Sequence, residues 1–89
     1  MASTFITIVN KLGLHARAAA KFVTLASQFQ SEIQLKRGNR IVNGKSIMGI
    51  MLLAASKGTE LELIAEGEDA EPALLALNEL VANKFGEGE

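Results

Sequence analysis

The single histidine of this 89-residue chain, His15, lies in Gly13-Leu14-His15-Ala16-Arg17, directly before a stretch with the residue pattern of a helix. A neutral imidazole is a nucleophile near neutral pH and is able to accept a phosphoryl group. Unpaired backbone N–H groups and the dipole at a helix start favour a bound phosphate, and Arg17 adds a guanidinium of fixed positive charge. These residues predict a histidine that is phosphorylated and then passes the phosphoryl group on.

The same helix start has consequences for the state of the ring. Its dipole disfavours the imidazolium form, so the ring is expected to stay neutral and able to attack. The small residues Gly13 and Ala16 are expected to leave the imidazole accessible to a partner.

A plainer interpretation stays open on residue type alone. A lone histidine commonly lies at a surface or helix end without chemistry, and Arg17 could be an ordinary exposed helix residue. No phosphate-binding loop of the G-x-x-x-x-G-K-[ST] type is present, and no carboxylate lies beside His15 in the sequence. The chain is therefore predicted to be an intermediate of phosphoryl transfer rather than a self-sufficient enzyme.

Composition limits the remaining classes of function. A hydrophobic content of 48% over 89 residues predicts one folded domain spanning residues 1–89. With no cysteine and one histidine, we expect no disulfide framework, no transition-metal site and no cofactor. The longest apolar run, Ile50 to Ala55, is too short to span a bilayer, and no signal peptide is recognised, so a cytoplasmic protein without membrane insertion is expected.

The net charge of −1 is distributed unevenly along the chain. Residues 1–57 contain eight of the nine basic residues and one acid, whereas residues 58–89 contain nine acids and one lysine. A basic surface around His15 and Ser46 would suit acidic protein partners. Nucleic acid is a weaker interpretation, because no Trp or Tyr is present to stack on bases and no basic cluster is dense.

Hydrophobic periodicity predicts the elements that position His15. Strands are predicted over residues 4–9, 32–36, 40–42 and 60–66, and helices over residues 16–28, 47–53 and from 70 onward. Ser46 and Asp69 are predicted helix N-caps, and Gly86 and Gly88 are predicted to end the last helix in a frayed tail. The order β-α-β-β-α-β-α, with one apolar stripe on each long helix, predicts an α+β fold of two layers.

Two segments resemble one known family. The run from Asn10 to Ala19 closely resembles the active-site segment of HPr, the histidine-containing phosphocarriers of the bacterial sugar phosphotransferase system. The run from Asn43 to Gly49 looks like the regulatory-serine segment of that family, at the matching distance in a chain of matching length. The resemblance implies an open-faced β-sandwich, in which a four-stranded antiparallel sheet of order 1-4-2-3 carries three helices on one face.

The resemblance also implies residue roles. His15 would carry the phosphoryl group on Nδ1, and Arg17 would stabilise it. Backbone N–H groups of Ala16, Arg17 and Ala18 are the expected phosphate donors. Ser46 would be phosphorylated by HPr kinase/phosphorylase, although capping alone already explains a serine there.

The implied partners are proteins. Enzyme I, charged from phosphoenolpyruvate, would be the donor, and IIA domains of sugar permeases would be the acceptors, with the chain acting as a monomer. The run from Ile47 to Leu53 holds more apolar residues than one short helix can bury, which leaves some for docking. The expected docking residues are Ala20, Ile47, Met48 and Met51, whereas Ile50 and Leu53 are expected in the core.

The active-site segment departs from the family pattern at Ala18, where proline is usual. Alanine allows the helix but adds an N–H group and removes a constraint, so the phosphate donors are expected to shift by up to one residue. Two further functions compete with the sugar-branch carrier. One is a nitrogen-branch paralogue with the same chemistry, against which Lys45-Ser46 argues mildly, and the other is a binding module that never carries phosphate.

Overall fold

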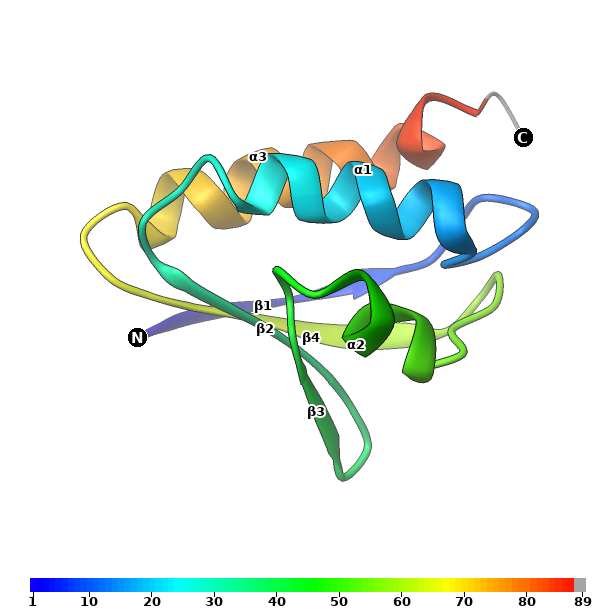
Figure 1. Ribbon diagram of the computed structural model, residues 1–89, viewed down its shortest axis with the longest axis horizontal. Coiled ribbons are helices and arrows are strands. Elements are labelled where there is room, and N and C mark those ends of the chain that lie inside the picture. Colours follow the sequence, from blue (N-terminus) through cyan, green and yellow to red (C-terminus); the bar gives the residue numbers. More distant parts are fainter. Residues whose placement is uncertain (88–89) are drawn as a thin grey trace.

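The computed structural model describes residues 1–87 and has the predicted order of elements (Figure 1). They are β1 (Ala2–Thr7), α1 (Ala16–Ala26), β2 (Glu32–Arg37), β3 (Arg40–Asn43), α2 (Ile47–Leu52), β4 (Glu60–Glu66), α3 (Ala70–Ala82) and a short 3₁₀ helix, η1 (Lys84–Gly86). The main differences from the predicted bounds are an earlier β1, an α1 that ends two residues sooner, and η1, which was not predicted.

The strands form one antiparallel sheet in the order β1-β4-β2-β3, which confirms the α+β open-faced arrangement. Helices α1 and α3 lie side by side over one face of the sheet, and α2 packs against α1 and β3 (Figure 1). The other sheet face meets solvent, where Phe5 and Ile41 are exposed. None of the helices within residues 1–87 has the length and apolar character needed to cross a bilayer.

The core between the two layers follows the sequence periodicity. Residues Ile33, Leu35, Leu61, Leu63 and Ala65 of the two central strands point inward and are buried, as their alternation predicts. The predicted stripe of α3 is buried at Ala70, Ala73, Leu74, Leu77 and Val81. In α1, Val23 is half-buried and packs against the same core, and its buried residues are Ala18, Ala19, Phe22 and Ala26.

Asp69 occupies the N-cap position of α3, but the predicted capping hydrogen bond is absent within the described residues. Its carboxylate instead accepts hydrogen bonds from the backbone N–H groups of Gln30, at 2.8 Å, and Ser31, at 2.9 Å, and from the Ser31 hydroxyl, at 2.5 Å. The Ser31 hydroxyl, followed by the Gln30 N–H, lowers the pKa of the Asp69 carboxyl below its ordinary value. Asp69 therefore ties the start of β2 to the start of α3.

The predicted frayed tail is wrong as far as Glu87, and Gly88 lies outside the described residues. Phe85 is buried in the core, and its carbonyl oxygen accepts a hydrogen bond from Lys21 Nζ at 2.6 Å. Three consecutive residues, Lys84, Phe85 and Gly86, have positive φ angles of 57°, 54° and 76°. This left-handed turn reverses the chain after α3, and the burial of Phe85 stabilises it.

Candidate functional site

His15 is itself the N-cap residue of α1. Its backbone is extended, and its Nδ1 accepts a hydrogen bond from the backbone N–H of Arg17 at 3.3 Å. The side chain is 28% exposed. The sequence placed His15 directly before the helix, and the structure adds that the ring uses one nitrogen to cap it.

The loop before His15 depends on Gly13. Gly13 has a φ of 71°, and a Cβ added there would lie 2.5 Å from the carbonyl oxygen of Ala55. The same oxygen accepts a hydrogen bond from the N–H of Leu14 at 2.9 Å, and Leu14 is buried. The missing side chain of Gly13 therefore permits close contact with residue 55, a role that the sequence did not predict.

The carboxylate of Glu87 contacts His15 from the far end of the chain. Glu87 Oε2 lies 2.5 Å from His15 Nε2, and Glu87 Oε1 accepts a hydrogen bond from Asn10 Nδ2 at 2.9 Å. The side chain of Glu87 is 14% exposed. The Asn10 amide, followed by His15, lowers the pKa of the Glu87 carboxyl below its ordinary value, although partial burial opposes this. Glu87 is consequently a carboxylate at neutral pH.

Sequence reasoning missed both Asn10 and Glu87. Asn10 carried a signal, because it belongs to the same segment as His15, but it was interpreted only as a loop residue. Glu87 carried no local signal, because 72 residues separate it from His15 and the turn at residues 84–86 brings it there. The expectation for the ring considered the helix start alone, whereas the structure also places a carboxylate against Nε2.

A cavity of about 710 Å³ opens beside the imidazole. It is lined by Lys11, Leu12, His15, Ala16, Arg17, Lys21, Gly86 and Glu87. Arg17 is exposed, and its guanidinium has no hydrogen bond or ion pair with any residue in the described part of the chain. The cavity thus has room for a phosphoryl group and basic side chains to offset its charge.

The expected phosphate donors lie in the first turn of α1. Helix α1 begins at Ala16 although position 18 holds alanine in place of the usual proline, so proline is not needed to start the helix here. The side chain of Ala18 is buried and that of Ala16 is exposed. The Arg17 N–H already donates to Nδ1, so it is placed to donate a hydrogen bond to an oxygen of a phosphoryl group bound to that nitrogen.

Helix α2 carries the second predicted site. Ser46 is its N-cap, as predicted, and Ser46 Oγ accepts a hydrogen bond from the Gly49 N–H at 3.0 Å. Ile50 and Leu53 are buried, as expected. Among the apolar residues of α2, Ile47, Met48, Met51 and Leu52 are exposed. Ala20, the remaining expected docking residue, is half-buried on α1.

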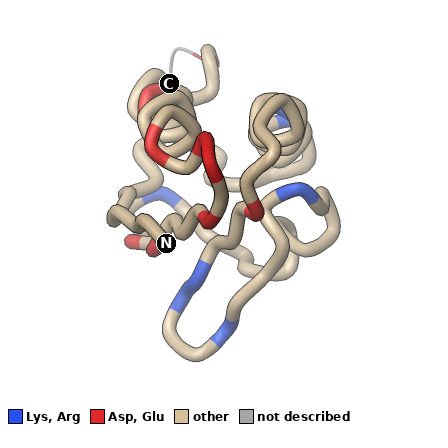
Figure 2. Tube along the Cα trace, turned by 90° about the vertical axis from the view of Figure 1, so that its left-hand side faces the viewer, with Lys and Arg blue, Asp and Glu red and all other residues tan. Residues whose placement is uncertain are grey.

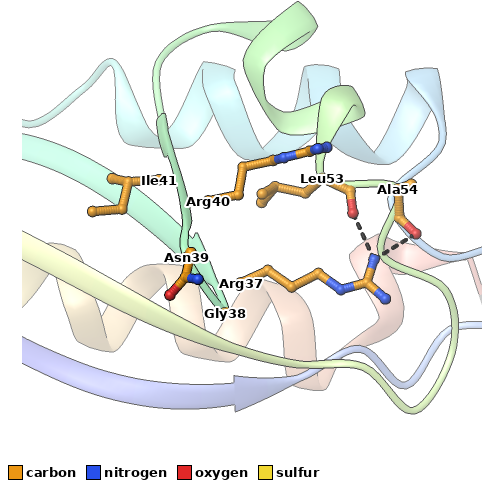
Figure 3. A pocket seen from close by; sticks show the side chains of 7 residues that line it. All are labelled: Arg37, Gly38, Asn39, Arg40, Ile41, Leu53 and Ala54. Carbon is orange, nitrogen blue, oxygen red and sulfur yellow. Dashed lines mark hydrogen bonds between the residues drawn. The ribbon is translucent and has the colours of Figure 1, made fainter.

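A larger cavity, of about 850 Å³, lies between the β2–β3 turn and the end of α2 and shares no lining residue with the first (Figure 3). Arg37 Nη1 donates hydrogen bonds to the carbonyl oxygens of Leu53, at 2.6 Å, and Ala54, at 3.1 Å. Arg40 Nη1 donates to the carbonyl oxygen of Leu52 at 2.7 Å. The two arginines satisfy the orphan carbonyls at the end of α2, which explains them structurally.

The acidic and basic residues, which are unevenly distributed along the sequence, also lie in different regions of the folded chain. Figure 2 shows acidic residues gathered around the start of α3, and basic residues on α1 and on the β2–β3 hairpin. Glu87 departs from this separation, because it belongs to the acidic half of the chain but lies against His15. Within residues 1–87 no three His, Cys, Asp or Glu side chains form a cluster that could hold a metal ion.

Comparisons with known proteins agree with this geometry. The family model described as the "PTS HPr component phosphorylation site" matches residues 2–83. Phosphocarrier protein HPr of Neisseria meningitidis serogroup A is 56% identical over 84 residues, which cover 94% of each chain. A crystal structure of HPr from Thermoanaerobacter tengcongensis superimposes with a TM-score of 0.94 at 53% identity, covering 98% of both chains.

A second structure, described as an HPr dimer from the same organism, gives a TM-score of 0.79 at 53% identity and covers 98% of this chain and 100% of that one. The relatives and the family model match nearly the whole length of this chain. The chain therefore belongs to the HPr family and is a phosphocarrier of the phosphotransferase system.

Proposed function

We propose that Nδ1 of His15 is the atom that receives and donates the phosphoryl group. The observation that carries this proposal is the unequal surroundings of the two ring nitrogens. Glu87 lies against Nε2, whereas Nδ1 faces the N–H of Arg17 at the start of α1. A phosphoryl group on Nδ1 would meet backbone donors and the positive end of a helix, and on Nε2 it would meet a carboxylate.

The transfer itself is a displacement at phosphorus. The lone pair of Nδ1 attacks, the new nitrogen–phosphorus bond forms, and the bond to the donor breaks with its electron pair leaving on the donor atom. Arg17 offsets the negative charge of the moving phosphoryl group. The backbone N–H groups of Ala16, Arg17 and Ala18 donate hydrogen bonds to its oxygens. The reverse displacement passes the group to the acceptor.

The partners follow from the family and from the exposed surface. The donor is Enzyme I, charged from phosphoenolpyruvate, and the acceptors are IIA domains of sugar permeases, met by a monomer in the cytoplasm. The exposed apolar face of α2, with Ile47, Met48 and Met51, serves as the docking surface together with Ala20 on α1. Methionine side chains adapt to partners of different shape, which suits a carrier with several acceptors.

Ser46 is the site of regulation in this proposal, through HPr kinase/phosphorylase. A phosphate there lies at the start of α2, where the helix N–H groups tolerate negative charge. The added charge of about −2 would stand beside the apolar docking residues. Phosphorylation of Ser46 should therefore weaken docking of acidic partners without unfolding the carrier.

Intact-mass analysis after incubation with Enzyme I and phosphoenolpyruvate tests the proposal. The chain should gain one acid-labile phosphate, about 80 Da, and His15→Ala should gain none. Arg17→Ala should gain it roughly 100-fold more slowly, because one charged donor is lost. Parallel reactions with sugar-branch and nitrogen-branch Enzyme I distinguish the two carriers, and a chain that accepts no phosphate from either would refute the proposal.

A further inference from the structure

We infer that Glu87, held by Asn10, positions the imidazole of His15 and stabilises the positive charge that the ring acquires when Nδ1 is phosphorylated. The positioning part of this inference rests on the hydrogen bonds around the ring. The charge-stabilising part rests also on the proposed function. Glu87 touches His15 and not the moving group, so it acts as a positioning residue.

The contacts define which ring nitrogen carries the proton. Nδ1 accepts the N–H of Arg17, so it presents a lone pair. Nε2 faces the Glu87 carboxylate at 2.5 Å, and an ionised carboxylate has only acceptors to offer. The neutral ring is therefore assigned its proton on Nε2, which leaves the Nδ1 lone pair as the nucleophile.

Asn10 is arranged to hold the carboxylate in place. Its amide NH₂ group donates both to the carbonyl oxygen of Gly13, at 2.9 Å, and to Glu87 Oε1, at 2.9 Å. The Asn10 side chain is fully buried, and its Oδ1 has no hydrogen-bond partner within residues 1–87. An unsatisfied buried oxygen lowers the stability of the fold. The stabilising contribution of the Asn10 side chain therefore comes from the two hydrogen bonds that its NH₂ group donates, one of them to Glu87.

The C-terminal turn delivers Glu87 to this position. Phe85 is anchored in the core, and the positive φ angles of Lys84 and Phe85 are conformations that side-chain-bearing residues seldom adopt. Lys21 on α1 holds the Phe85 carbonyl oxygen at 2.6 Å, close to the helix start that His15 caps. Strained backbone of this kind persists where the surrounding structure requires it, and here it brings a carboxylate to the imidazole.

The chemistry of transfer gives the carboxylate its role. When Nδ1 of a neutral ring attacks phosphorus, Nε2 keeps its proton and the ring becomes positively charged. The Glu87 carboxylate faces that charge, as the aspartate of a catalytic triad faces its imidazolium. On onward transfer the nitrogen–phosphorus bond breaks, its electron pair returns to Nδ1, and the group that leaves is a neutral imidazole rather than an anion.

Three variants of the full chain separate this inference from the proposed function. Glu87→Ala removes the contact, Glu87→Gln keeps a hydrogen-bond acceptor but removes the charge, and Glu79→Gln makes the same charge change on the exposed face of α3. Each is labelled with ¹⁵N to observe the Nε2 proton of unphosphorylated His15. Each is then phosphorylated and mixed with a IIA domain to measure single-turnover transfer.

The wild-type chain should show an Nε2 proton protected from exchange with water, and Glu87→Ala should lose that signal. Glu87→Gln should fold normally by circular dichroism but transfer phosphate at least about 10-fold more slowly, whereas Glu79→Gln should match the wild type. A wild-type proton on Nδ1, or Glu87 variants within twofold of the wild-type rate, would overturn the inference. Phosphate on His15→Ala would instead overturn the proposed function.

Discussion

Gly13 shows how a residue without functional groups controls the site at the scale of single atoms. Its φ is 71°, and a Cβ at this position would come within 2.5 Å of the Ala55 oxygen, which leaves no room for a side chain. Gly13→Ala should lower the free energy of unfolding by roughly 2–4 kcal/mol in urea titrations, because strain and a backbone clash add. Gly38→Ala is the matched control, since Gly38 has a φ of 59° but no atom near its Cβ position.

Gly38→Ala should cost only about 1 kcal/mol, from the left-handed backbone alone. Equal losses in the two variants would show that the contact with Ala55 contributes nothing. The loop would then owe its shape to the conformational freedom of glycine, and not to its packing against residue 55.

At the scale of elements, α2 combines a cap and a docking face in six residues. Ser46→Ala should lower the free energy of unfolding by about 1 kcal/mol, because Gly49 N–H loses its acceptor. Ser46→Asp keeps an acceptor and places negative charge at a helix start, so its stability should stay within about 0.5 kcal/mol of the wild type. Its phosphorylation by Enzyme I should nevertheless slow at least about 10-fold, through repulsion of an acidic partner.

Quenched time courses of phosphorylation by Enzyme I measure the predicted change in rate, and urea titrations on the same preparations measure the predicted change in stability. If Ser46→Asp were phosphorylated at the wild-type rate, α2 would not be a docking face for Enzyme I. If it were destabilised as much as Ser46→Ala, the capping account of residue 46 would be wrong.

At the scale of the whole molecule, Asp69 links the two layers and should make stability depend on pH. The pKa of its carboxyl is lowered by the Ser31 hydroxyl and the Gln30 N–H, so its contribution is present above the ordinary pKa of an aspartate, about 3.9. That contribution is lost as the pH falls through the lower, folded-state pKa. Asp69→Asn should therefore be less stable than the wild type at pH 7, and the difference should shrink below about pH 4.

Urea titrations from pH 7 to pH 2 measure this difference. Glu71→Gln is the control, because Glu71 is an exposed acid in the first turn of α3. Its difference in stability from the wild type should not shrink comparably as the pH falls. A difference between Asp69→Asn and the wild type that stays constant with pH would mean that the ionised carboxylate is not what joins Ser31 to α3.

The elements could be predicted from sequence where the information is local. The alternation of Leu61, Leu63 and Ala65 and the stripe of α3 depend only on periodicity, and Ser46 is a cap by residue type and position. The sheet order came from the family resemblance, because periodicity does not specify which strands pair. Contacts between distant segments were not predictable: Asp69 turns to Ser31, and Glu87 reaches His15 only because Phe85 anchors a left-handed turn.

The most direct test of the account is the nitrogen that carries phosphorus in the phosphorylated chain. In ¹⁵N-labelled phosphoprotein, the phosphorus–nitrogen coupling of His15 should appear on Nδ1, the atom that faces the Arg17 N–H. Nε2 should remain protonated and uncoupled, because the Glu87 carboxylate lies against it. Coupling on Nε2 would contradict the account, since phosphate would then occupy the place of that carboxylate.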